Sequence, residues 1–104
     1  MVLYVMQWNI RPDKMAEYLE WSQSAVGRTI SVPGVVEFRG YRPASGASQV
    51  VITFEFADMA AWAAWYGHET IQTVIDEVHA LTTDLKLEIW GPSSVVPEPI
   101  RPGS

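Results

Sequence analysis

Four segments of the sequence are rich in β-branched and aromatic residues, and two segments with helical periodicity lie between them, in an order that few folds accommodate. The β-rich segments are residues 2–10, 35–42, 49–56 and 85–90. The first helical segment opens at Pro12 and ends before Pro33. The second follows an expected N-cap at Asp58 and continues to about residue 81, with an expected break at Gly67. This order predicts one α+β domain of βαββαβ type.

The length of the chain allows one hydrophobic core. With 104 residues there is no room for a second independent core, so residues 1–92 are expected to form the domain. Residues 93–104 are rich in proline and are expected to form a separate tail. This tail is interpreted either as an arm that lies across the partner in a dimer or as a frayed terminus.

Alternation within the strands separates an apolar face of the predicted sheet from a mixed one, because neighbouring side chains in a strand point to opposite sides. The apolar face is expected to meet the helices and holds Tyr4, Met6, Trp8, Ile10, Val36, Phe38, Val50, Ile52, Phe54, Phe56, Leu85, Leu87 and Ile89. The mixed face holds Leu3, Val5, Gln7, Asn9, Glu37, Arg39, Tyr41, Val51, Thr53, Glu55, Lys86, Glu88 and Trp90.

The mixed face predicts a homodimer. Both helices of a two-layer domain cover one face of the sheet, so the other face meets either water or a partner. The apolar residues of the mixed face would form an exposed patch, and a second copy presenting the same face is the simplest partner for it. The residues expected at this dimer face are Glu37, Arg39, Tyr41, Glu55, Lys86, Glu88 and Trp90.

Composition excludes several classes of protein and partner. The chain has no cysteine, which excludes disulfides and Cys-based zinc sites and fits an expected cytoplasmic location. Residues 1–10 lack the features of a signal peptide, and no apolar run is long enough to span a bilayer. The net charge is -5 without a stripe of Lys and Arg, so neither nucleic acid nor a membrane surface is an expected partner.

Three stretches of the sequence carry a resemblance to a known family. They are residues 5–14 (VMQWNIRPDK) leading into Tyr18 and Leu19, residues 32–36 (VPGVV) and residues 53–62 (TFEFADMAAW). They resemble the dimeric α+β barrel superfamily of ferredoxin-like domains, and within it the antibiotic-biosynthesis monooxygenase-like group. The resemblance spans roughly residues 2–90 and implies a four-stranded antiparallel sheet with two helices on one face, a homodimer, and a pocket between sheet and helices for a small hydrophobic or aromatic molecule.

The same resemblance bears on cofactors. Some members of the group oxidise polyketide phenols with dioxygen and no cofactor, and this implies that no cofactor is needed here. Others degrade haem with an Asn at the end of the first strand, a Trp in the second helix and a His ten residues after that Trp. Asn9 and Trp65 match the first two positions, but the third is Ile75. Without this axial ligand the haem-degrading interpretation is disfavoured.

Aromatic residues and one histidine are the candidates for a ligand site. Trp62, Trp65 and Tyr66 crowd one helical segment beside His68, and with Trp8 and Trp21 they would form walls for a phenolic ligand, with His68 as the base. The alternative is that Trp62 and Trp65, three residues apart on a helix, pack on the sheet as core. Trp21, at the edge of its helix stripe, is either a pocket rim or a partly exposed aromatic.

Three further interpretations concern polar residues. Asn9 is a second catalytic candidate, since it lies near the end of its strand and would orient an oxygen substituent at the pocket mouth. For Arg39, pairing with Glu37, Glu55 or Glu88 across the dimer is favoured over a ligand role. Asp76 and His79 share a helical face but have no third convergent ligand, so no metal site is expected.

Two classes of function remain from the sequence. The first is a cofactor-independent monooxygenase, or a related small enzyme, that acts on an aromatic or polyketide-like compound. The second is a non-catalytic ligand-binding or structural homodimer in which the same aromatics are core. Replacement of His68 separates the two, because activity should fall without loss of stability only in the first.

Overall fold

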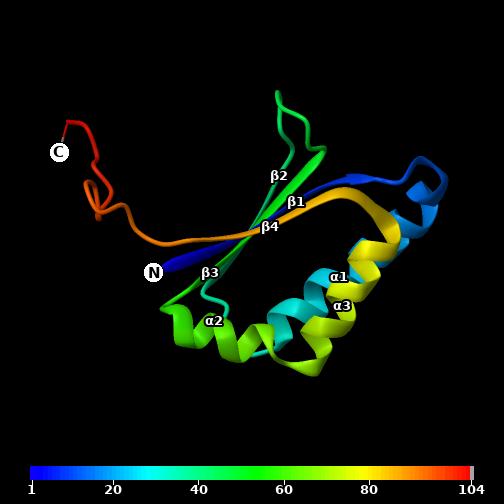
Figure 1. Ribbon diagram of the computed structural model, residues 1–104, viewed down its shortest axis with the longest axis horizontal. Helices are drawn as coiled ribbons and strands as arrows, with labels where there is room; N and C mark the ends of the chain where they lie inside the picture. Colours follow the sequence, from blue (N-terminus) through cyan, green and yellow to red (C-terminus); the bar gives the residue numbers. More distant parts are fainter. Residues whose placement is uncertain (104) are drawn as a thin grey trace.

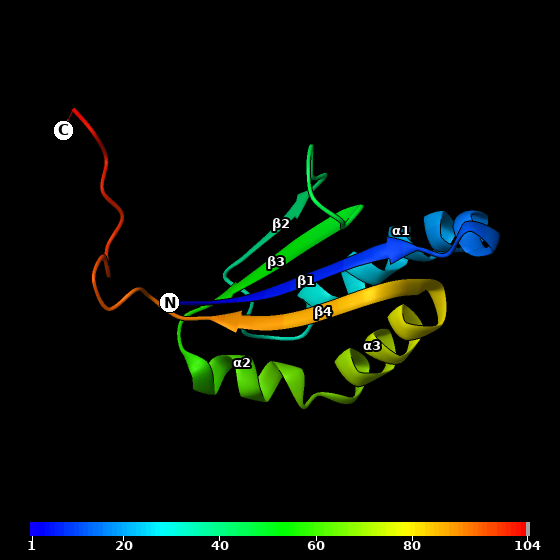
Figure 2. The same ribbon diagram turned by 45° about the horizontal axis from the view of Figure 1, so that its top comes forward.

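The computed structural model describes residues 1–103 and has a four-stranded antiparallel sheet with helices packed on one face (Figures 1 and 2). The elements in chain order are β1 (Val2–Ile10), a 3-10 turn (Pro12–Lys14), α1 (Met15–Ser31), β2 (Glu37–Tyr41), β3 (Val50–Phe56), α2 (Met59–Tyr66), α3 (Glu69–Leu81) and β4 (Thr82–Trp90). The strand order across the sheet is β2-β3-β1-β4. The predicted ferredoxin-like α+β fold is confirmed.

The second helical segment consists of two helices, and it breaks at the residue where a break was expected. Asp58 caps α2, because its side chain accepts a 2.8 Å hydrogen bond from the backbone N–H of Ala61. Gly67 ends α2, and His68 is the N-cap of α3. The helices on the sheet are therefore α1, α2 and α3 rather than two continuous helices.

Strand β4 begins earlier than the sequence pattern predicts. Its first residues, Thr82 and Thr83, pair with Ile10 and Asn9, and the register with β1 then shifts between Asn9 and Gln7. Asp84 lies at this irregularity with φ 55°, in the left-handed region that non-glycine residues rarely adopt. The irregularity interrupts the alternation of side chains, and for this reason the sequence pattern shows only the part of the strand after it.

The apolar face of the sheet packs against the helices as expected. Phe54, Phe56 and Trp65 are no more than 1% exposed and lie at the centre of the core. Burial of one such side chain contributes about 2–3 kcal/mol. Val36 is a correction, because it precedes the start of β2 and is 55% exposed rather than part of this face.

The mixed face consists of three rows of side chains that cross the four strands. In the order β2, β3, β1, β4 the rows are Glu37-Glu55-Leu3-Trp90, Arg39-Thr53-Val5-Glu88 and Tyr41-Val51-Gln7-Lys86. All seven residues expected at the dimer face lie in these rows. The exposed apolar surface is smaller than expected, since Val5 and Thr53 are already buried within one chain, while Tyr41 and Trp90 at the two edges are half exposed.

The proline-rich tail leaves the sheet after Trp90 and extends on the side opposite to the helices (Figures 1 and 2). Pro97, Glu98 and Pro99 face a hollow that is also lined by Trp90 and Leu3 of the mixed face. Val95 and Ile100 are exposed. The tail thus makes no part of the core. Among residues 1–103, no helix has the length and apolar character needed to cross a membrane.

Candidate functional site

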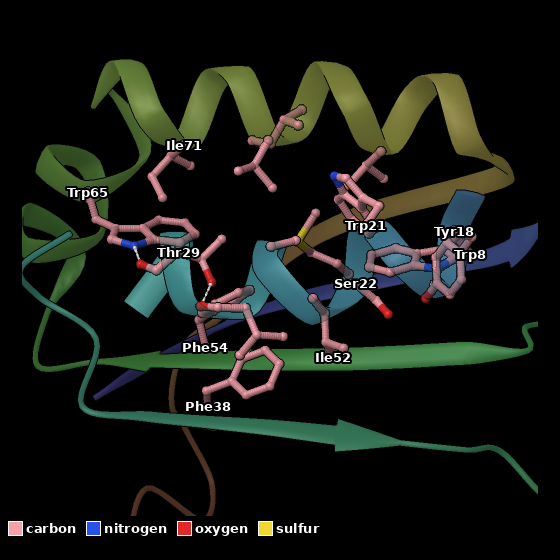
Figure 3. Close-up of a pocket in the computed structure, with 16 residues that line it drawn as sticks. Trp8, Tyr18, Trp21, Ser22, Thr29, Phe38, Ile52, Phe54, Trp65 and Ile71 are labelled. Atoms are coloured by element: carbon pink, nitrogen blue, oxygen red, sulfur yellow. Dashed lines mark hydrogen bonds between the residues drawn. The ribbon is translucent and has the colours of Figure 1, made fainter. Parts of the chain in front are cut away.

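A cavity of about 180 Å³ lies between the apolar face of the sheet and the helices (Figure 3). β1 and β3 supply Met6, Ile52 and Phe54, and β2 adds Phe38 at the edge of the sheet. α3 supplies an aliphatic wall of Ile71, Val74, Ile75 and Val78, and α1 supplies the opposite wall. Val26 on α1 also lines the cavity and is 37% exposed, so the cavity reaches the surface beside this residue. The lining is almost entirely apolar.

Three tryptophans line the cavity, and each uses its indole N–H on a protein group. Trp8 Nε1 donates to the Tyr18 hydroxyl at 3.1 Å, Trp21 Nε1 donates to Glu77 at 2.8 Å, and Trp65 Nε1 donates to the carbonyl of Thr29 at 2.9 Å. The last bond is drawn in Figure 3. The rings therefore present apolar surface to the cavity while their polar atoms are satisfied elsewhere.

The hydroxyl groups of the lining also donate hydrogen bonds to protein groups, with one exception. Ser22 donates to the carbonyl of Leu19 and Thr29 donates to the carbonyl of Val26, both within α1. Tyr18 accepts a hydrogen bond from Trp8, but among residues 1–103 no acceptor is found for its own hydroxyl proton. The Tyr18 hydroxyl is therefore the one donor of the lining without an acceptor among the described residues.

Tyr18 remains neutral at ordinary pH. Burial raises the pKa of its phenol because the low-polarity surroundings disfavour the phenolate, and the hydrogen bond from Trp8 offsets only part of this effect. A neutral phenol donates a hydrogen bond but does not accept a proton. Tyr18 thus suits the binding of an oxygen atom on a ligand.

A polar seam joins α1 to α3 behind Trp21. Arg28 on α1 donates two hydrogen bonds to the Glu77 carboxylate on α3, at 2.6 and 3.3 Å, and Trp21 donates a third. These bonds, first among them those from Arg28, lower the pKa of Glu77. The seam holds the two helices together at the cavity wall and fixes the ring of Trp21.

Trp62 and Tyr66, expected in the pocket, lie in a separate aromatic cluster around Tyr4. The ring centroid of Tyr4 is 5.8 Å from those of both Trp62 and Tyr66, and the Trp62 and Tyr66 rings stack at 5.0 Å. Neither residue lines the cavity. The Tyr4 hydroxyl and Trp62 Nε1 are buried without a hydrogen bond of normal geometry. Burial, followed by the neighbouring Tyr66 hydroxyl, raises the pKa of Tyr4.

The two candidate catalytic residues lie outside the cavity. His68 is exposed at the start of α3, where its Nδ1 accepts a 3.1 Å hydrogen bond from the backbone N–H of Thr70. Asn9 accepts a 2.8 Å bond from the backbone N–H of Gln49 and donates a 3.2 Å bond to Asp84. Asn9 thus connects the end of β1 to Gln49, the residue before β3, and to the irregular part of β4. The structure brings neither side chain to the cavity lining.

The geometry also bears on metal and haem. Within residues 1–103 no group of three potential metal ligands converges, and Glu77, beside the Asp76 and His79 considered above, is bound to Arg28 instead. Ile75, which occupies the position of the histidine in haem-degrading relatives, lines the cavity with an aliphatic side chain. No histidine lines the cavity. The lining therefore does not fit a histidine-ligated haem.

Sequence reasoning missed Tyr18 and the Arg28–Glu77 pair. A signal for Tyr18 was present, since it is one of the apolar residues that recur at helical spacing along the first helical segment. No signal in the sequence connects Trp21 to Glu77, because the two residues lie 56 positions apart and meet only through the packing of α1 on α3.

Comparisons with known proteins give one matching family and several solved structures with the same fold. The model of the antibiotic biosynthesis monooxygenase family matches residues 1–77. No curated protein matches the sequence. A mutant of SnoaB, a cofactor-independent oxygenase from Streptomyces nogalater, is 16% identical with a TM-score of 0.73, and the match covers 93% of this chain and 97% of that chain.

Two other solved structures have the same fold. Rv0793 from Mycobacterium tuberculosis is 17% identical with a TM-score of 0.72, and covers 89% of this chain and 95% of its own. At3g17210 from Arabidopsis thaliana is 12% identical with a TM-score of 0.78, and covers 90% of this chain and 97% of its own. At these identities the likeness shows the fold, and the family model, which matches most of the chain, shows the family. The protein belongs to the antibiotic biosynthesis monooxygenase family.

Proposed function

We propose that the protein is a cofactor-independent monooxygenase that acts on a small aromatic compound. The observation that carries the proposal is the cavity, whose walls include Trp8, Trp21 and Trp65 and whose lining offers one uncommitted hydrogen-bond donor, Tyr18. Such a site binds a flat apolar molecule by contact area and orients it through a single oxygen atom.

The volume limits the size of the substrate. An apolar protein cavity of roughly 150 Å³ holds one benzene molecule. A cavity of about 180 Å³ therefore encloses about one aromatic ring with a substituent, and any further ring extends past Val26 into solvent. A monocyclic or bicyclic phenol fits better than a fully enclosed tetracycle.

The chemistry needs little from the protein. An electron-rich phenol that loses a proton supplies the electrons that reduce dioxygen. One oxygen atom then replaces the single hydrogen of a ring carbon as a carbonyl, and the phenol oxygen becomes the second carbonyl of a quinone. The second oxygen atom leaves as water with the ring hydrogen and the phenol proton. The tryptophan walls exclude water, and the Tyr18 hydroxyl stabilises negative charge that develops on the substrate oxygen.

A second candidate is a binding protein without catalysis, and a specific observation favours it. Tyr18 is the only titratable side chain among the cavity-lining residues, and its raised pKa makes it unsuitable as a base. If the substrate does not ionise in water by itself, the cavity binds it without turnover. The two candidates share the ligand class and differ in oxygen consumption.

We further propose that the protein is a homodimer whose interface is the mixed face of the sheet. Two features support this arrangement: the helices leave that face uncovered, and Tyr41 and Trp90 on it are half exposed. The tail rises on the same side and is proposed as an arm against the second copy.

The experiment is a tryptophan-fluorescence titration with monocyclic and bicyclic phenols and with haem, followed in air with an oxygen electrode. A phenol that quenches saturably and consumes oxygen supports the oxygenase. Quenching without oxygen uptake supports the binding protein. Absence of quenching by every phenol in the panel contradicts both.

Two variants make the titration specific for the cavity. Ala25→Leu places a larger side chain in the lining, where Ala25 is buried, and is expected to weaken phenol binding at least tenfold. Trp90→Phe removes the tryptophan of the mixed face and is expected to leave the quenching unchanged. Loss of quenching in Trp90→Phe would move the binding site to the mixed face.

A further inference from the structure

The mixed face carries charges of both signs at its two edges, in the same row. Arg39 lies on edge strand β2 and Glu88 on edge strand β4, and the register places both in the central row with Thr53 and Val5 between them. Lys86, also on β4, lies in the next row, at the end opposite Tyr41 on β2. Opposite edges of the face therefore carry complementary groups.

A two-fold axis between two such faces has two simple orientations, and they bring different residues together. If the axis is parallel to the strands, β2 of one copy covers β4 of the other. Each row then faces the same row of the second copy, running in the opposite direction. If the axis is parallel to the rows, each strand meets its own copy. The charges of the central row distinguish the two arrangements.

With the axis parallel to the strands, Arg39 of each copy faces Glu88 of the other, Tyr41 faces Lys86, and Thr53 faces Val5. The first contact is an ion pair and the second a cation–π contact, and each occurs twice. With the axis parallel to the rows, Arg39 faces Arg39 and Glu88 faces Glu88, which opposes association. We propose that the homodimer inferred above has its axis parallel to the strands and is held in register by two reciprocal Arg39–Glu88 ion pairs. This inference rests on the proposed homodimer.

Both partners have unused capacity for this contact. Arg39 Nε donates to Glu37 at 2.5 Å along its own strand, and the guanidinium also lies beside the Tyr41 hydroxyl. A guanidinium has five N–H donors, so Arg39 can still reach a second carboxylate. Oε1 of Glu88 accepts a 3.1 Å bond from Trp90, and its other oxygen accepts no hydrogen bond from residues 1–103. Both residues are exposed in the single chain, so the contact requires no rearrangement of the core.

Sheet twist does not remove the pairing. Facing sheets cross at about 30°, and an edge strand lies about 7 Å from the middle of a four-stranded sheet. The crossing therefore displaces the ends of the central row by about 4 Å relative to each other. The long side chains of arginine and glutamate span such a displacement. A shift of one copy along the strands by a whole row would separate Arg39 from Glu88.

The test is charge reversal, measured as the dimer dissociation constant by sedimentation equilibrium. Arg39→Glu and Glu88→Arg are each expected to raise this constant at least about thirtyfold, because each places two like-charged pairs in the interface. The double variant R39E/E88R restores the pairs in reverse and is expected to return within about fivefold of the parent. Glu20→Arg, the same charge change on exposed residue Glu20 of α1, is the control and should have no effect.

The outcomes separate the pairing from the dimer itself. A parent protein that is monomeric at all concentrations contradicts the homodimer and the pairing together. A dimeric parent whose double variant is as weak as the single variants contradicts the pairing alone. So does a dimeric parent whose single variants remain as tight as the parent, which is the result expected for an axis parallel to the rows. Thermal melting by circular dichroism verifies that each variant is folded.

Discussion

Trp21 Nε1 and Glu77 Oε1 are joined by a hydrogen bond of 2.8 Å that connects the cavity wall to the seam between α1 and α3. The same carboxylate accepts a hydrogen bond from each of the two terminal nitrogens of Arg28. One acidic side chain therefore fixes an aromatic wall and the relative position of two helices. Changes at Glu77 should alter stability and ligand binding together.

Glu77→Gln should lower stability in a pH-dependent way. The bonds from Arg28 lower the pKa of Glu77 in the folded protein, so its contribution is complete above the unfolded value of about 4.3 and disappears as the pH falls through the folded value. The pair is partly exposed, so we expect a loss of about 1 kcal/mol or less at pH 7 and almost none at pH 3. Melting curves at both pH values measure this, with Glu20→Gln as control. An equal loss at pH 3 would contradict the role of the charge.

Two buried tyrosines should respond oppositely to removal of the hydroxyl group. Tyr18→Phe leaves the N–H of Trp8, which is 2% exposed, without an acceptor and should cost about 1–3 kcal/mol. Tyr4→Phe removes a buried hydroxyl that lies beside the Tyr66 hydroxyl but makes no hydrogen bond of normal geometry, and it should leave stability unchanged or slightly higher. Urea unfolding at pH 7 compares the two variants. A larger loss for Tyr4→Phe would indicate that its hydroxyl has a partner, such as a buried water.

The same tyrosines should limit stability in alkali. Burial raises the pKa of Tyr4 and of Tyr18 in the folded state, so the folded protein keeps protons that the unfolded chain releases above about pH 10. Stability is therefore complete below that pH and falls above it. Tyr4→Phe should show a shallower decline in melting temperature between about pH 9 and 11 than the parent does. If the melting temperatures of Tyr4→Phe and the parent decline equally with pH, ionisation of Tyr4 does not limit stability in alkali.

His68 should matter for the helix start and not for oxygen consumption. His68→Ala removes the acceptor for the N–H of Thr70 and should cost about 1 kcal/mol. His68→Asn keeps a capping acceptor but removes the imidazole, so its melting temperature and its phenol-dependent oxygen uptake should match the parent. Loss of oxygen uptake in His68→Asn at unchanged stability would restore His68 as the base.

Removal of the tail should weaken association without unfolding the domain. Residues 93–103 add nothing to the core, and the tail lies on the side of the mixed face. A chain that ends at residue 92 should keep its melting temperature when monomeric, while its dimer dissociation constant rises. Sedimentation equilibrium of the shortened chain measures the change. An unchanged constant would show that the tail makes no contact with the second copy.

The order and type of the elements were predictable from the sequence because each element has its own periodicity and its own end signal. Pro12, Asp58 and Gly67 mark helix ends in the structure as their chemistry predicts. The early start of β4 was not predictable, because Asp84 adopts a left-handed conformation there and the bond to Asn9 that accompanies it connects residues far apart in sequence.

An aromatic cavity between the sheet and the helices was predictable from the sequence, but the residues that line it were not. Trp62 and Trp65 lie three residues apart in one helix and both suited a pocket wall, yet only Trp65 lines the cavity while Trp62 packs on Tyr4. The choice depends on how α2 is rotated on the sheet, which involves Asp58, Gly67 and the close approach of Gly34 to Ala61. The rotation of α2 about its own axis leaves no pattern in the sequence that would separate Trp62 from Trp65.

Because the three indole N–H groups of the cavity are all satisfied by the protein, the aliphatic residues between them are free to diverge. Exchange of one aliphatic side chain for another at Ile71, Val74 or Val78 alters the shape of the cavity and removes no hydrogen-bond partner from a buried polar atom. A gene duplicate of such a chain can therefore acquire a new ligand by a few conservative changes, while the hydrogen bonds that maintain its architecture are inherited intact.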